Sequence, residues 1–287
     1  MDVQIIAVPY DSGHRSQRMG LGPEHFLRRG LEDALRAKGH DARVSTIEAQ
    51  ESFQAEIKTA FELHRRLSES VGEACSRQRF PLVLSGNCNS SLGTLAGVGH
   101  TPQTGIIWLD SHGDFNTPET TTSGFLDGMG FATAVGLCWK EMAASIPNFQ
   151  PVHGSHAMHI GVRDFSSDEE ELFRQAGVTV ICAETIRRLG VQDALCSSIE
   201  ALSARVQRVY LHIDLDVLDP ALTKANEFAA PDGLLPAQVE EIIQTIGERF
   251  QICASAIASY DPKCDEHDQT LRAGIRLMET ILAYARV

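Results

Sequence analysis

The sequence predicts an α/β fold, a three-layer αβα sandwich with a mainly parallel central sheet. Two observations support this prediction: short apolar segments recur along the 287 residues, and segments with helical patterns separate them. Strands that alternate with helices favour a parallel sheet, because a helix is the usual crossover between parallel strands and covers a face of the sheet. No internal repeat, low-complexity linker or clear boundary interrupts the chain, so we expect one domain over residues 1–287.

The expected strands are short apolar runs bounded by polar or turn residues. They cover residues 3–9, 81–85, 105–109, 157–162, 178–182, 209–215 and 252–259. The expected helices cover residues 23–38, 53–77, 191–205, 236–250 and 268–286. In sheets of this kind the functional sites form at the carboxyl ends of the strands.

The composition is that of a soluble globular protein, with 43% hydrophobic and 22% charged residues. The formal net charge of −13 argues against a nucleic-acid partner or an anionic membrane surface. No apolar stretch approaches the roughly 20 residues needed to span a bilayer, and the apolar run at residues 3–8 lacks the basic flank of a signal peptide. The seven cysteines are scattered and odd in number, which indicates free thiols and a reducing, cytoplasmic compartment.

A cluster of potential metal ligands directly follows the expected strand 105–109. Asp110, His112 and Asp114 are spaced by two residues, so their side chains point the same way if the chain stays extended past the strand end. The alternative is a polar loop that caps the following helix, since Asp, Ser and Thr are common in such loops.

A second acidic cluster changes the balance between these alternatives. Asp214 and Asp216 end the expected strand 209–215 with the same spacing, and Asp219 precedes a proline. Such a cluster of charges cannot be buried without a compensating cation. Carboxylates together with an imidazole suit a hard or borderline divalent metal ion, so the two clusters favour a site for one or two such ions.

These segments resemble the signatures of the arginase/agmatinase (ureohydrolase) family. The main matches are DSHGDFNTP at 110–118, the Ser-Gly pair at 123–124 and DLDVLDP at 214–220. Shorter matches are MGLGPE at 19–24, SGNCNS at 85–90, GVRD at 161–164 and YDP at 260–262, so the resemblance spans nearly the whole chain. It implies a hydrolase that acts on guanidino or related C–N bonds with two divalent metal ions, expected to be Mn²⁺. It also implies a small-molecule guanidino or amidine-type substrate and a homo-oligomer, a trimer or hexamer.

The resemblance assigns ligand roles by position. Asp110 and Asp214 correspond to carboxylates that bridge the two metals, His112 and Asp216 complete one metal, and Asp114 ligates the other.

The sixth ligand of the family is a histidine, and this chain has Cys88 at that position. We expect Cys88 to face the metal. The alternatives are that Cys88 is a small buried apolar residue, the usual fate of a free cysteine, or that Asn87 or Asn89 faces the metal instead.

The half of the site that contacts the substrate departs from the family pattern. Asp127 stands where the family commonly has a histidine that shuttles protons, and we expect Asp127 to be catalytic. The expected metal ligand Asp114 is the other expected catalytic residue. Ser259 replaces the glutamate that pairs with the guanidinium, although Asp261 lies two residues away as a substitute partner. Phe125 and Ser166 replace residues with which arginases hold the amino-acid end of the substrate. The expected substrate-binding residues are Asn116, Thr121, Ser123, Phe125, Asp164, Ser166, Phe228 and Ser259.

We therefore predict a metal-dependent hydrolase of a guanidino, hydroxyguanidino or formimino compound that uses a metal-bridging hydroxide. Plain arginine is not the expected substrate, because Ser259 leaves a guanidinium without its carboxylate. One alternative is a catalytically weak metal-binding protein with a regulatory or structural role. Another is a covalent hydrolase based on Cys88, with His100 or His112 as base; it leaves the acidic clusters unexplained.

Overall fold

The computed structural model describes residues 1–99, 101 and 103–285. Its main sheet has eight strands, all paired in parallel, in the order β4-β1-β5-β10-β9-β6-β7-β8. The strands are β1 (Asp2–Val8), β4 (Asp41–Thr46), β5 (Phe80–Ser85), β6 (Thr104–Leu109), β7 (Ala157–Ile160), β8 (Thr179–Ile181), β9 (Arg208–Asp214) and β10 (Gln251–Ala258). A small antiparallel pair is formed by β2 (Tyr10–Asp11) and β3 (His14–Arg15).

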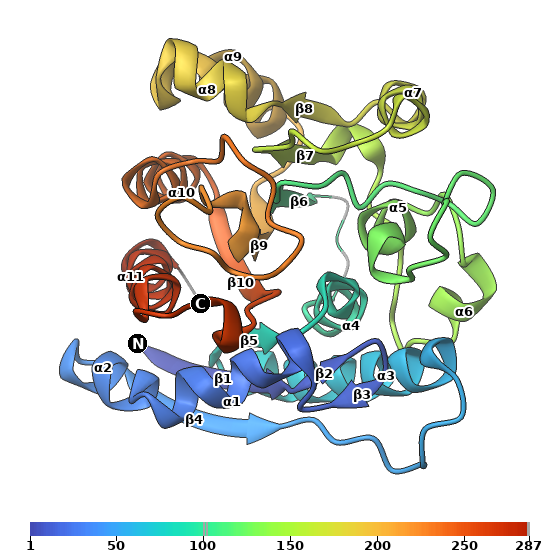
Figure 1. The fold of residues 1–287 in the computed structure, drawn as a ribbon, viewed down its shortest axis with the longest axis vertical. Coiled ribbons are helices and arrows are strands. Elements are labelled where there is room, and N and C mark those ends of the chain that lie inside the picture. Colours follow the sequence, from blue (N-terminus) through green and yellow to red (C-terminus); the bar gives the residue numbers. More distant parts are fainter. Residues whose placement is uncertain (100, 102, 286–287) are drawn as a thin grey trace.

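Helices cover both faces of the sheet and complete a three-layer α/β sandwich (Figure 1). One face packs on α1 (Gly22–Arg28), α2 (Leu31–Ala37), α8 (Ala183–Leu189), α9 (Val191–Ser203), α10 (Pro236–Arg249) and α11 (Gln269–Tyr284). The other packs on α3 (Glu56–Ser76), α4 (Ser91–Gly97), α5 (Gly130–Ala134), α6 (Lys140–Ala144) and α7 (Ser167–Ala176). The buried apolar residues form two clusters, one on each side of the sheet. Among the described residues, no helix is long and apolar enough to span a membrane.

The predicted strands are all present, and their ends agree with the prediction to within two residues. Besides the short pair β2 and β3, one strand of the main sheet was missed: β4 is an edge strand that pairs with β1, and most of its side chains are not buried. Its sequence therefore lacks the continuous apolar run of the central strands.

The prediction of a single helix over residues 23–38 was wrong. Gly30 has a left-handed backbone (φ 86°) and separates α1 from α2, a conformation that glycine adopts without steric cost. The helices α4 to α8 were also missed: all except α7 have at most seven residues, and α4 and α5 carry no charged residue that would mark a polar face. The predicted helix 268–286 is present as α11, and its last residue, Arg286, lies outside the described part of the chain.

The topology brings four strand ends together at the centre of the sheet. Strands β5, β10, β9 and β6 are neighbours in space although they are distant in the sequence (Figure 1). Since all four run parallel, the residues that follow them meet at one edge. The predicted ligands lie in the segments after Ser85 and Leu109 and at the end of β9, from Asp214 onward, and Ser259 follows β10 at the same edge.

Candidate metal centre and active site

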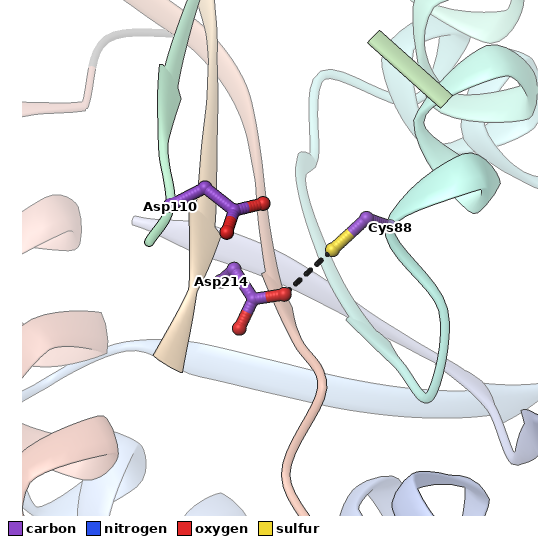
Figure 2. A group of neighbouring side chains, drawn as sticks. All are labelled: Cys88, Asp110 and Asp214. Carbon is purple, nitrogen blue, oxygen red and sulfur yellow. Dashed lines mark hydrogen bonds between the residues drawn. The ribbon is translucent and has the colours of Figure 1, made fainter. Parts of the chain in front are cut away.

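The first group of potential ligands consists of Cys88, Asp110 and Asp214. One donor atom from each lies within 4.8 Å of the others, and all three residues are buried. Cys88 begins the short 3-10 helix η2 (Cys88–Ser90) after β5, and its side chain points toward the acids at the ends of β6 and β9 (Figure 2). The thiol donates to Oδ2 of Asp214 at 2.9 Å, and its sulfur lies 3.3 Å from Oγ of Ser259. Cys88, rather than Asn87 or Asn89, is thus the residue of this segment that faces the acids.

The second group consists of Asp110, His112 and Asp216, with donor atoms again within 4.8 Å of one another. Nδ1 of His112 lies 3.4 Å from Oδ1 of Asp110 and 3.4 Å from Oδ2 of Asp216. Nε2 of His112 is 3.2 Å from the carbonyl oxygen of Phe228, which can only accept a hydrogen bond. In the neutral imidazole, a proton on Nε2 leaves the lone pair of Nδ1 directed at the acids, where it is able to ligate a metal ion. Asp110 belongs to both groups, whereas Asp214, the other expected bridge, belongs only to the first, and both bridging roles stay predictions.

The electrostatics of the two groups fit divalent cations. Burial, followed by the charges of Asp216 and Asp110, raises the pKa of Asp214 well above its ordinary value. Burial and the charge of Asp214 likewise raise the pKa of the Cys88 thiol. Without a metal, His112 offsets part of this charge as an imidazolium: burial lowers its pKa, but Asp216 and Asp110 outweigh burial and raise it. A metal ion bound at Nδ1 would take the place of that proton. Metal ions at this position would supply the positive charge that these buried donors otherwise lack.

Asp114 departs from the arrangement predicted for it. Its backbone is left-handed (φ 48°), so the chain does not stay extended as far as this residue, and neither group of clustered donor atoms includes its carboxylate. Asp114 is nonetheless buried and lines the same cavity as Asp216. Burial and the charge of Asp110 raise its pKa well above the ordinary value. Its role as ligand stays a prediction that requires a change of side-chain position.

Neighbouring side chains orient the predicted ligands. Nε1 of Trp108 donates to Oδ2 of Asp110 at 3.1 Å, and Oγ of Ser111 donates to Oδ1 of Asp216 at 2.7 Å. The side chain of Asn226 donates to Oδ2 of Asp216 at 3.1 Å and to the backbone oxygen of Ser259 at 2.9 Å. Asn226 was missed by the sequence analysis. It is a single amide in a loop ten residues after Asp216, with no motif to distinguish it.

Asp127 is connected to the segment that carries Cys88. Its Oδ2 accepts the side-chain N–H of Asn87 at 2.8 Å and the backbone N–H of Cys88 at 3.0 Å, and its Oδ1 accepts the backbone N–H of Asn89 at 2.7 Å. A carboxylate offers about four acceptor positions, so one position on Oδ1 remains for a proton. Burial raises the pKa of Asp127 to about 7, against the lowering effect of these N–H groups. Asp127 therefore fixes the start of η2 and can hold a proton at the cavity wall.

A cavity of about 440 Å³ opens above these groups. The predicted substrate-binding residues that line it are Asn116, Phe125, Asp164, Ser166, Phe228 and Ser259. Cys88 and Asp110 are buried and lie outside its lining. Thr121 and Ser123 are also outside the lining. Their hydroxyl oxygens instead accept the backbone N–H groups of Gly124 and Phe125, which shapes the loop.

Ser166 has a structural contact in addition to its place at the cavity. Its Oγ accepts the backbone N–H of Glu169 at 3.2 Å, and the Glu169 carboxylate accepts the N–H of Ser166 at 2.9 Å. This reciprocal pair is a capping box that starts α7. The Ser-x-x-Glu spacing was present in the sequence and would have predicted the helix.

The thiol of Cys88 has Asp214 and Ser259 as hydrogen-bond partners within the described residues. His112 faces Asp110 and Asp216 instead. The covalent mechanism requires an imidazole beside the sulfur, and these contacts do not favour it. The other base named for that mechanism, His100, lies outside the described residues.

Comparisons with known proteins agree with this geometry. The model of the Arginase family matches residues 1–283. An arginase of Bacillus caldovelox is 28% identical over 293 aligned residues, which cover 97% of this chain and 97% of that protein. The crystal structure of arginase from Bacillus cereus is 26% identical, covers 98% of each chain and superposes with a TM-score of 0.89. Formimidoylglutamase from Bacillus subtilis subsp. subtilis str. 168 shares the fold, with a TM-score of 0.78 at 20% identity over 99% of this chain and 86% of that one. The chain belongs to the arginase family.

Proposed function

We propose that this protein hydrolyses a linear C–N bond in a guanidino, hydroxyguanidino or formimino compound and that it depends on two divalent metal ions. As a member of the arginase family it is a hydrolase of guanidino or amidino C–N bonds. The observation that carries the proposal is the pair of buried donor groups that share Asp110 beside the cavity. The ligands would be Cys88, Asp110, His112, Asp114, Asp214 and Asp216, with Mn²⁺ as the expected ion.

Two ions held there would lower the pKa of a water molecule and so provide a nucleophile at neutral pH. The protein groups then have two tasks. The donors at the ends of β6 and β9 fix the position of the reacting centre, and the cavity wall orients the trigonal carbon above it. Asp127, whose pKa is raised to about 7 by burial, or an ordered water molecule delivers the proton that the leaving nitrogen needs.

The substrate end that reacts should be neutral or weakly basic. Ser259 is buried and offers a hydroxyl where a guanidinium would need a carboxylate. Asp261 is not a substitute partner, because it lies outside the cavity lining and its Oδ1 accepts the backbone N–H of Lys263. An unpaired guanidinium in a dry site costs several kcal/mol. A formimino group or an N-hydroxylated guanidine is less basic and reduces this cost.

A screen for ammonia and urea release tests the proposal. The Mn²⁺-loaded protein should hydrolyse at least one formimino or hydroxyguanidino compound, and Asp110→Ala should abolish the activity. The alternative function, a metal-binding protein with little catalysis, predicts full metal occupancy and no turnover of any compound in the screen. Absence of both metal binding and turnover would contradict both functions.

A further inference from the structure

The outer part of the cavity carries two aromatic rings that the metal centre does not use. Phe125 and Phe228 both line the cavity, with ring centroids 6.2 Å apart. The side chain of Phe228 is 48% exposed although it is large and apolar. Its backbone is held at two points: its carbonyl accepts from His112 at 3.2 Å, and its N–H donates to Asn226 at 2.8 Å. These bonds hold the backbone of Phe228 beside the candidate metal centre, and its ring stays exposed.

The exposed charged side chains of the cavity lining are acidic. Asp164 and Asp168 line the cavity and are exposed. Glu169, the other acid in this part, is buried and accepts hydrogen bonds from Ser166 and Phe115. None of the described residues in the lining is a lysine or arginine. A carboxylate on the far end of a substrate would therefore meet two acids and no cationic side chain at the mouth.

Apolar and cationic groups, unlike a carboxylate, gain favourable contacts at this surface. An apolar tail that covers the exposed ring of Phe228 and the half-buried ring of Phe125 removes apolar surface from water. A cationic amine gains in addition from the ring faces, through cation–π attraction, and from the two carboxylates. Both kinds of tail suit this surface better than the zwitterionic end of an amino acid.

We propose that the far end of the substrate carries no carboxylate and places an apolar or cationic group against Phe125 and Phe228. This inference rests on the proposed function, but it concerns the tail of the substrate and not its reactive end. It departs from the amino-acid substrate suggested by the name of the related arginases.

A series of compounds with one reactive head and different tails tests this selectivity. Butylguanidine, agmatine, 4-guanidinobutyrate and arginine share a guanidino group on an alkyl chain, so the absence of a carboxylate at Ser259 affects all four alike. We would measure kcat/KM with the Mn²⁺-loaded protein and, where turnover is slow, Kd by calorimetry. Butylguanidine and agmatine should exceed 4-guanidinobutyrate by about tenfold, an order of magnitude set by a weak ring contact and two partly screened charges.

Substitutions in the cavity lining separate the contribution of the aromatic rings to tail selectivity from that of the two carboxylates. Phe228→Ala should weaken butylguanidine and agmatine severalfold and leave 4-guanidinobutyrate nearly unchanged. The double variant Asp164→Asn, Asp168→Asn should reduce the advantage of agmatine over 4-guanidinobutyrate, and added salt should do the same in the unmodified protein. Phe53→Ala is the matched control, because Phe53 is 46% exposed but contacts the ring of His14 and lies outside the cavity lining.

Failure of this inference can be distinguished from failure of the proposed hydrolase function. If no compound of any head group is hydrolysed, the proposed function fails, and the order of Kd values still decides the tail preference. Equal or tighter binding of 4-guanidinobutyrate, or a series in which no compound binds, would overturn the inference.

Discussion

The thiol of Cys88 lies 2.9 Å from Oδ2 of Asp214, and this contact places a sulfur where the family resemblance implies an imidazole ligand. A thiolate at this position also changes the net charge of the metal centre. Four aspartates and a thiolate would bring −5 against +4 from two divalent ions, whereas a neutral histidine would balance them. A thiolate should weaken the Lewis acidity of its metal and favour a borderline or softer ion. Activation of water would then depend more on the metal beside His112.

Metal should protect Cys88 from alkylation. A thiolate bound to metal is unavailable to an alkylating reagent, and chelation should restore its reactivity. Peptide mass spectrometry distinguishes Cys88 from the other six cysteines, and exposed Cys196 is an internal control whose modification should not respond to metal. Cys88→His should raise Mn²⁺ occupancy. Alkylation of Cys88 at the same measurable rate with and without metal would show that its sulfur is not a ligand; because Cys88 is buried, the rates are compared at a reagent concentration that modifies it in the metal-free protein.

Asp127→Asn should destabilise the protein and loosen the segment that carries Cys88. The variant places an NH₂ group among three N–H donors, so at least one buried polar group loses its partner, at a cost of about 1–3 kcal/mol. Urea denaturation measures this cost, and Glu119→Gln, which changes an exposed acid of the same loop, is the control. We also expect faster alkylation of Cys88 in the metal-free variant. A variant with unchanged stability and alkylation rate but lost turnover would assign Asp127 to proton transfer alone.

Ser259→Glu should shift preference toward charged guanidinium substrates. The new carboxylate would lie close to the Cys88 sulfur, which is 3.3 Å from Oγ of Ser259, so the effect should be largest in a Cys88→His background. The measurement is the ratio of kcat/KM for arginine to that for a formimino compound. Ser259→Gln has the same size without the charge and should not raise the ratio. Efficient arginine turnover by the unmodified protein would mean that another acid already pairs with the guanidinium.

The buried histidine of β7 should make the fold sensitive to acid. His159 packs between Phe131 and Phe173, and burial lowers its pKa from 6.5 to about 3. The unfolded chain binds a proton at this residue below pH 6.5 and the folded chain does not. Stability from this residue is therefore present above pH 6.5 and is lost as the pH falls toward 3, by about 1.4 kcal/mol per pH unit. His159→Phe should reduce the loss of stability between pH 7.5 and pH 5; an unchanged difference would contradict this.

The sequence was sufficient for the strands of the main sheet other than the edge strand β4 and for most of the donor cluster, because both follow from local patterns. Buried parallel strands are continuous apolar runs, and their carboxyl ends meet wherever the strands are neighbours. The spacing argument failed at Asp114, whose left-handed backbone ends the alternation after His112. A period-two pattern cannot show where the chain leaves the extended conformation.

The walls of the cavity could be predicted only in part. Thr121 and Ser123 were expected to touch the substrate, yet their hydroxyls close the loop onto its own backbone. Asn226 connects Asp216 to Ser259, a contact that depends on the packing of a loop against a distant strand end. Such contacts leave no pattern in the sequence, unlike the ligand motifs.

Metal stoichiometry in three proteins tests the central claim, a two-metal centre that shares Asp110, most directly. Elemental analysis after Mn²⁺ loading should give two ions per chain for the unmodified protein and none for Asp110→Ala, because its carboxylate belongs to both donor groups. Asp216→Asn should lose mainly the ion beside His112 and retain the other. Full retention of metal by Asp110→Ala, or at most one ion in the unmodified protein at saturating Mn²⁺, would contradict the account.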